Sequence, residues 1–199
     1  MANKKLLAEV IGTFSLTFIL LLGANTTDFP IPIPILAGLI LALFVYTIGS
    51  ISGCHINPAV TVGLFSIKKI DSQEAIRYIV AQCIGGILAF IALKSLDIDI
   101  IGLNWMGLNA VMVGEIVGTV FFTFGIAATV LGKMPDMVKG VVIGGSLLLG
   151  ASVASMIGAP GFLNPAVALG ANSLAPSTII GPLIGSVIGM KLYQFLTTS

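Results

Sequence analysis

Six apolar stretches run through this sequence, and they restrict its possible folds more than any other feature. They cover roughly residues 6–24, 35–51, 76–94, 111–131, 138–156 and 177–196. Each is about long enough to cross the ~30 Å hydrocarbon layer of a bilayer as a helix. Only 9% of the residues are charged, whereas soluble domains average about 25%. The sequence therefore predicts an all-α polytopic membrane protein with six transmembrane helices.

Two shorter apolar segments, at about 57–67 and 164–173, are long enough for only half of a membrane crossing. Each begins with Asn-Pro-Ala. Asparagine is a strong helix N-cap because its side-chain oxygen accepts a hydrogen bond from the first turn. Proline is favoured at the next position, where its missing N–H would be unpaired anyway. We therefore expect two re-entrant half-helices, which start at Asn57, Pro58 and Ala59, and at Asn164, Pro165 and Ala166.

The sequence also repeats itself. The segment AEVIGTFSLTF at 8–18 matches GEIVGTVFFTF at 114–124, and the two Asn-Pro-Ala copies are separated by a similar offset. Each half holds three spans and one half-helix, so the two halves must cross the membrane in opposite orientations. We expect one membrane domain over 1–199, built as an inverted repeat with halves of about 1–105 and 106–199. In such architectures the solute path lies at the interface of the repeats.

The opposed half-helices are predicted to meet with their N-termini near the middle of the membrane. Two positive dipole ends and two Asn amide groups would then converge on one point, where a permeating molecule could accept hydrogen bonds. The segments that lead into the half-helices cannot be helical, and exposed carbonyls are tolerated only where they line a wet cavity. The predicted pore-lining carbonyls are those of Gly53, Cys54, His55 and Phe162.

Basic residues give the orientation. With the N-terminus in the cytoplasm, eight of the nine Lys and Arg residues fall on the cytoplasmic side, and only Lys94 falls outside. This is a positive-inside pattern, so both termini are expected in the cytoplasm and the protein in the plasma membrane. The single tryptophan, Trp105, is expected to be an interfacial anchor in an outer loop.

No motif of an enzyme is present in the sequence. Both cysteines lie in apolar segments, and no nucleophile–base pair, phosphate-binding loop or cluster of metal ligands can be recognised. We therefore expect no catalytic activity, no cofactor and no metal. The net charge of +1, without a long basic run, gives no reason to expect a nucleic-acid partner.

The motifs resemble those of the aquaporin, or major intrinsic protein, family across essentially the whole chain. The matching segments are AEVIGTF, SGCHINPAVTVG, YIVAQCIGG, GEIVGTVFFTF, GFLNPAVALG and GPLIGSVIG. The resemblance implies an aquaporin-like fold and a homotetramer with one pore per subunit. Its expected partners are the lipid bilayer, water and small uncharged solutes.

Two departures from the family pattern stand at the predicted outer constriction. Val167 occupies the place where most relatives carry an arginine, and Ala168 replaces the aspartate that follows it in glycerol-conducting members. By the same resemblance the constriction is formed by Ala37, Ala151 (or Ser152), Gly161 and Val167. Without a large side chain or a fixed charge, this constriction is expected to admit solutes of glycerol size or larger.

Several polar residues in the apolar segments have two interpretations. Glu9 and Glu115 could form a proton relay, but their symmetric placement and the family pattern favour acceptors for the N–H groups of the re-entrant loops. His55 could sense pH or brace its loop, and Gln82 is expected to bond to loop backbone. Cys54 could face the pore or be packed and inert.

Two other functions remain open at this point. The inverted repeat also builds coupled secondary transporters and ion-conducting pores, and the missing arginine weakens the argument for ion exclusion. A membrane junction or scaffold protein of the same fold would need only a closed pore. A passive channel is the interpretation that the motifs favour.

Overall fold

The chain is described by a computed structural model that covers residues 2–98, 100, 108–132 and 134–198. The predicted boundary between the halves at 105/106 and the predicted anchor Trp105 lie outside these residues. The described part contains eight helices and no strand. They are α1 (Ala2–Ala24), α2 (Ile33–Ser52), α3 (Pro58–Ser66), α4 (Ser72–Ser95), α5 (Leu108–Leu131), α6 (Asp136–Ile157), α7 (Pro165–Gly170) and α8 (Pro176–Thr197).

Six of these helices are long and apolar enough to cross a membrane, which confirms the six predicted spans. The remaining two, α3 and α7, are the predicted half-helices. The second of them, α7, ends at Gly170, a few residues before the end of the apolar segment at about 164–173. Asn172 adopts a left-handed φ of 49°, and the N–H of Ser173 bonds back to the carbonyl of Ala168 at 3.0 Å. This tight turn ends the helix.

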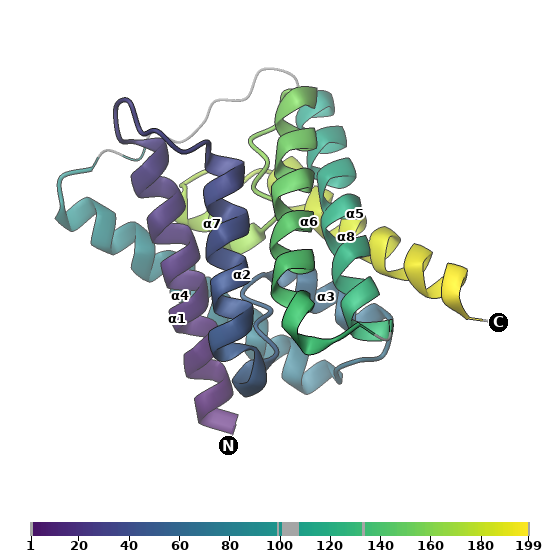
Figure 1. The fold of residues 1–199 in the computed structure, drawn as a ribbon. Helices are drawn as coiled ribbons and strands as arrows, with labels where there is room; N and C mark the ends of the chain where they lie inside the picture. Colours follow the sequence, from purple (N-terminus) through teal and green to yellow (C-terminus); the bar gives the residue numbers. More distant parts are fainter. Residues whose placement is uncertain (1, 99, 101–107, 133, 199) are drawn as a thin grey trace.

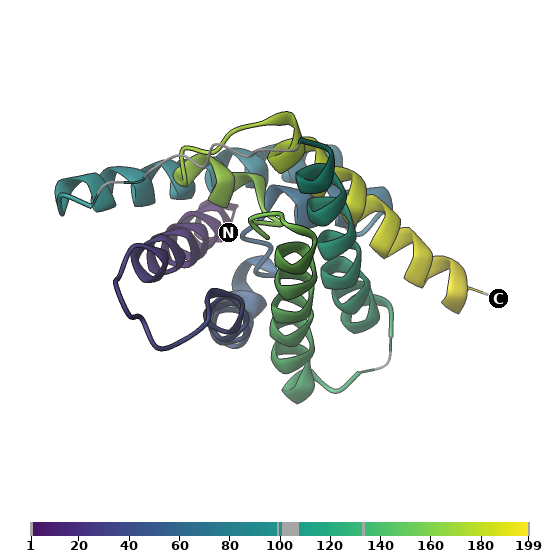
Figure 2. The same cartoon turned by 90° about the horizontal axis from the view of Figure 1, so that it is seen from above.

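The helices of the two halves correspond in order, and their packing interlocks the halves. α1 packs on α4 and α5 packs on α8, while α2 and α6 contact each other across the repeat. Each half-helix also packs on the last helix of the opposite half, α3 on α8 and α7 on α4. In Figure 1, α3 lies in the lower part of the molecule and α7 in the upper part. Figure 2 shows α4 and α8 running out to opposite sides of the bundle.

The contact between α2 and α6 depends on two glycines. A Cβ added to Gly38 would lie 2.6 Å from the carbonyl oxygen of Gly144, and a Cβ added to Gly144 would overlap with the carbonyl oxygen of Gly38. Small residues allow helix backbones to approach this closely in membranes, where van der Waals packing drives association. The two halves are therefore joined backbone to backbone at this point.

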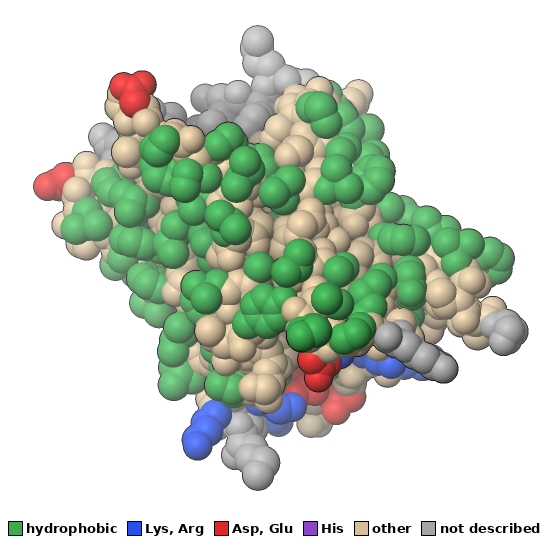
Figure 3. All heavy atoms as spheres, in the orientation of Figure 1, with side chains coloured by type: hydrophobic (Ala, Val, Ile, Leu, Met, Phe, Trp, Pro, Cys, Tyr) green, Lys and Arg blue, Asp and Glu red, His purple; other side chains and the backbone are tan. Residues whose placement is uncertain are grey.

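The outer surface fits a lipid environment between two polar ends. Apolar side chains cover the flank of the bundle that Figure 3 shows, and Lys and Arg side chains gather at the end where the N-terminus lies. Many large apolar residues of the spans are exposed, among them Leu39, Leu43, Val80 and Met156. Such a surface is stable only when it is covered by lipid or by another apolar surface.

Gly144→Ala is expected to destabilise the protein, because the added methyl group pushes α6 away from α2. Overpacking of this kind costs about 1–3 kcal/mol. Gly145→Ala is the matched control, since no atom lies within 4 Å of a Cβ at that position. Alanine is a better helix former than glycine, so the control is expected to retain or gain stability. Thermal unfolding in detergent measures both variants, and equal stability of the two would contradict this account of the helix contact.

Candidate pore centre and outer cavity

Two asparagines begin the half-helices at the centre of the molecule. Asn57 has an extended backbone, and its side-chain oxygen accepts a hydrogen bond from the N–H of Ala59 at 2.7 Å. Asn164 does the same for the N–H of Ala166 at 3.0 Å. Pro58 and Pro165 occupy the first helical positions. Both half-helices thus begin with the local chemistry that the sequence indicates.

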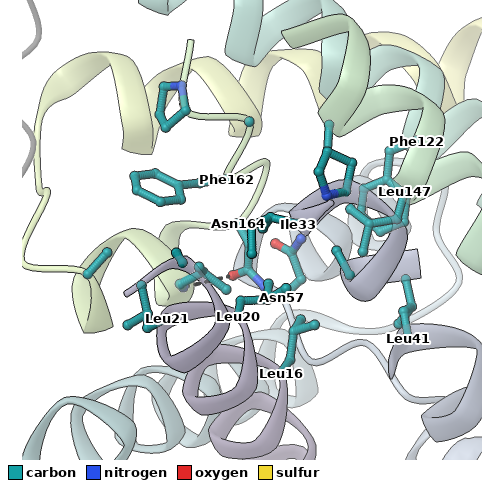
Figure 4. Close-up of a pocket in the computed structure, with 18 of the residues that line it drawn as sticks. Leu16, Leu20, Leu21, Ile33, Leu41, Asn57, Phe122, Leu147, Phe162 and Asn164 are labelled. Atoms are coloured by element: carbon teal, nitrogen blue, oxygen red, sulfur yellow. Dashed lines mark hydrogen bonds between the residues drawn. The ribbon is translucent and has the colours of Figure 1, made fainter. Parts of the chain in front are cut away.

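The remaining amide hydrogens of the asparagines tie the two loops together. Asn57 Nδ2 donates to the carbonyl oxygen of Leu163 at 2.8 Å, and Asn164 Nδ2 donates to the carbonyl oxygen of Ile56 at 3.0 Å. Figure 4 shows the two amide groups close together beside the cavity. An amide NH₂ carries two hydrogens, so each asparagine keeps one that could serve a solute. Sequence reasoning missed these crossed bonds, because no local pattern links residues more than a hundred positions apart.

Two buried carboxylates hold the loops in matching ways. Glu9 accepts the N–H of His55 at 3.0 Å and that of Ile56 at 2.6 Å. Glu115 accepts the N–H of Phe162 at 2.9 Å and that of Leu163 at 2.8 Å. These contacts match the acceptor role considered for both residues. Non-helical backbone at membrane depth needs such partners wherever its polar groups do not face a water-filled cavity.

The first loop is held by more contacts than the second. Glu9 also accepts from Ser52 Oγ at 2.6 Å and from Gln82 Nε2 at 2.7 Å. The expectation that Gln82 bonds to loop backbone was wrong: Gln82 Nε2 donates to Glu9 and to Thr61 Oγ1, at 2.9 Å for the latter. Gln82 therefore acts on the loop through the carboxylate, a connection that only the packing of α4 against α1 creates.

His55 and Cys54 occupy different environments. His55 Nδ1 lies 3.1 Å from Thr61 Oγ1, its ring packs edge-on against Tyr78, and the residue also lines the outer cavity. These contacts fit a bracing role. Cys54 is buried, and neither it nor Gly53 is among the residues that line that cavity. For Cys54, this placement fits the packed alternative.

A cavity of about 370 Å³ extends from the Asn pair toward the ends of α1 and α6. All four residues expected at the constriction line it, namely Ala37, Ala151, Gly161 and Val167, together with the predicted Phe162. Of the two alternatives on α6, Ala151 lines the cavity and Ser152 does not, while Ser155 does one turn further along. The structure thus gathers these residues around one space.

The wall of this cavity is mainly apolar and carries no charge. Asn25, His55 and Ser155 join the two central asparagines as its polar residues, and no Asp, Glu, Lys or Arg from the described ranges lines it. The apolar wall, which the sequence does not predict, is formed by Leu16, Leu20, Leu21, Leu41, Phe122 and Leu147 (Figure 4). Hydropathy cannot distinguish a leucine that faces a cavity from one that faces lipid.

The sequence and the fold are similar to those of known proteins. The sequence model of the family "Major intrinsic protein" matches residues 1–193. The chain is 31% identical to Aquaporin AqpM of Methanothermobacter marburgensis, with 98% of each chain covered. It is 39% identical to Glycerol uptake facilitator protein-like 6 of Lactiplantibacillus plantarum over 56% of this chain and 50% of that protein. In fold it is similar to the X-ray structure of the aquaglyceroporin from Plasmodium falciparum, with a TM-score of 0.77 at 21% identity and 97% and 96% of the two chains covered.

Glu9→Gln is expected to destabilise the protein more than Glu115→Gln. Each oxygen of Glu9 accepts two hydrogen bonds and each oxygen of Glu115 accepts one. A glutamine NH₂ cannot accept these hydrogen bonds, so it leaves two buried donors without an acceptor at position 9 and one at position 115. Each such donor lowers the free energy of unfolding by about 1–3 kcal/mol. Glu74→Gln, which removes a partly exposed ion pair with Lys5, is the control. Equal thermal unfolding midpoints for the three variants would contradict the bracing role of the two carboxylates.

Proposed function

The chain belongs to the major intrinsic protein family, and on this basis we propose that its outer constriction admits uncharged solutes of glycerol size as well as water. Family membership makes the protein a passive channel for water or small solutes in a membrane, and not an enzyme.

The observation that carries the proposal is the size and neutrality of the outer cavity. The four residues expected at the constriction are small or medium in size, and all are uncharged: Ala37, Ala151, Gly161 and Val167. At Val167 we expected most relatives to carry an arginine, which would both narrow the pore and charge it. Selectivity of such pores depends on diameter, on the donors and acceptors that line them and on electrostatic barriers. A relative named as a glycerol uptake facilitator gives further support.

The geometry suggests how an uncharged solute would pass. It would enter beside Asn25 at the end of α1, follow the apolar wall and reach the Asn pair. There the second hydrogen of each amide group could donate to a solute hydroxyl oxygen. The N-terminus of α3 contributes its positive dipole end at the same place. A cation would meet this field with no acidic side chain of the described residues lining the cavity, and an unpaired charge in an apolar environment is costly.

The ion-conducting or coupled-transport alternative has less support. Glu9 and Glu115 are the buried acidic residues of the described ranges, and both accept hydrogen bonds from loop N–H groups. Neither lines the cavity. A coupling or conduction site needs an ionisable group that can exchange with the path, and family membership does not favour this function.

We further propose the assembly and orientation that the sequence indicates. The protein would be a homotetramer in the plasma membrane with one pore per subunit and both termini in the cytoplasm. Basic side chains that gather at the N-terminal end of the bundle (Figure 3) support this orientation.

Ala37→Phe is expected to lower glycerol flux by roughly tenfold or more and water flux by less, because a phenyl ring narrows the path where diameter selects the solute. Leu39→Phe is the matched control, since Leu39 lies on the same helix with 59% of its surface exposed, outside the cavity. Stopped-flow light scattering of proteoliposomes measures both fluxes. Equal glycerol flux in the two variants would exclude Ala37 from the constriction.

Val167→Arg tests whether the absence of an arginine at this position controls glycerol flux. Restoring a large charged side chain should reduce glycerol flux and leave a water channel, whereas Val167→Leu, which adds one methylene group, should keep most glycerol flux. The same light-scattering assay compares the variants at equal protein content. If glycerol flux through Val167→Arg equals that of the unmodified protein, Val167 does not control the outer path.

A further inference from the structure

A second cavity, of about 230 Å³, lies between the N-terminal ends of α1 and α4, at the opposite end of the molecule from the outer cavity. Unlike the outer cavity, it is lined by charged residues of both signs: Lys5 and Arg77, and Asp71 and Glu74. The ring of Tyr78 also lines it. Nothing in the channel function described above requires such a cavity.

Lys5 and Glu74 form an ion pair, whereas the exposed side chains of Asp71 and Arg77 have no ion-pair partner within the described residues. Lys5 Nζ lies 2.7 Å from Glu74 Oε1 and joins α1 to α4. Arg77 makes no hydrogen bond or ion pair within the described part of the chain. Asp71 uses Oδ1 to accept the N–H of Glu74 at 2.8 Å, as the N-cap of α4, which leaves its other oxygen open. Glu74 and Arg77 are neighbours at a spacing of three on α4, and Asp71 lies at the N-cap of the same helix.

The cavity lies where the bundle passes from an apolar to a polar surface. Leu7 and Ile76, which adjoin two of the lining residues in sequence, are 58% and 64% exposed. The same end carries the basic side chains seen in Figure 3. A ligand with an apolar body and a polar head could therefore place its head in the cavity while its body covers the exposed apolar residues.

We propose that this cavity binds the headgroup of phosphatidylethanolamine, with the phosphate on Arg77 and the primary ammonium on Asp71. The guanidinium group of arginine matches a phosphate with two parallel N–H bonds. An ammonium group offers three N–H donors, one of which can reach the open carboxylate oxygen. A choline headgroup has no N–H donor, and a glycerol headgroup has no positive charge. The pair of open charges therefore selects a zwitterion with a primary amine.

The site is one side chain away from the pore loop. Tyr78 donates its hydroxyl to the carbonyl oxygen of Ser52 at 2.8 Å, and its ring lies 4.9 Å from that of His55, centroid to centroid. Tyr78 is only 2% exposed, so a bound headgroup would pack against its buried edge in the cavity and hold it in this arrangement. Lipid binding is therefore expected to stabilise the first loop, whatever solute the channel conducts.

Lipid binding to the purified protein tests the proposal. Native mass spectrometry would measure retention of phosphatidylethanolamine, phosphatidylcholine and phosphatidylglycerol with matched acyl chains. Phosphatidylethanolamine should be retained most. Arg77→Gln should weaken its binding by roughly tenfold, the usual loss for a hydrogen bond to a charged group. Asp71→Asn should remove the preference over phosphatidylcholine, and its fold should be intact because asparagine is an equally good N-cap.

Lys69→Gln is the control, because Lys69 is exposed at the same end of the molecule but does not line the cavity; it should bind all three lipids as the unmodified protein does. Equal retention of the three lipids, or the same loss in Lys69→Gln as in Arg77→Gln, would overturn the proposal. Strongest binding of phosphatidylglycerol with no effect of Asp71→Asn would also overturn it. Inorganic phosphate and soluble glycerophosphoethanolamine should not displace the lipid at equal concentration, and displacement by phosphate alone would indicate a free-anion site instead.

Discussion

Backbone that is not helical cannot lie inside a membrane without hydrogen-bond partners, and the structure depends on how this chain meets that constraint. Glu9 and Glu115 each accept two successive N–H groups of a loop, and each central asparagine donates to a carbonyl of the opposite loop. The loops are therefore fixed to the first helix of their own half and to each other. This arrangement places the two Asn-Pro-Ala segments side by side and leaves one hydrogen of each amide group for a solute.

The packing of the bundle serves the same arrangement. Because α3 packs on α8 and α7 on α4, neither half can be displaced without moving the other. The backbone contact of α2 with α6 at Gly38 and Gly144 joins the halves a second time. A rigid frame of this kind suits a passive channel, since a coupled transporter must rock one repeat against the other. Selectivity is then left to the side chains around the outer cavity.

Short sequence patterns predict the spans, the half-helix starts and the inverted repeat. The spans follow from hydropathy, the half-helix starts from Asn and Pro, and the inversion from an odd number of spans per half. Three features were not predictable. The end of α7 depends on the turn at Asn172, the partner of Gln82 depends on the packing of α4 against α1, and the apolar wall around Leu20 and Leu147 depends on which face of each helix turns inward. The end of α7 arises from a local left-handed turn, whereas the partner of Gln82 and the apolar wall arise from contacts between residues distant in sequence or from the direction in which a side chain points.

The central claim is that a wide, uncharged outer cavity leads an uncharged solute larger than water to the Asn pair. Light scattering of proteoliposomes containing the unmodified protein tests it most directly, by comparing shrinkage under an impermeant osmolyte with re-swelling under a glycerol gradient. We expect both to be much faster than in protein-free vesicles. Fast shrinkage together with glycerol re-swelling no faster than in protein-free vesicles would contradict the claim and indicate a channel restricted to water.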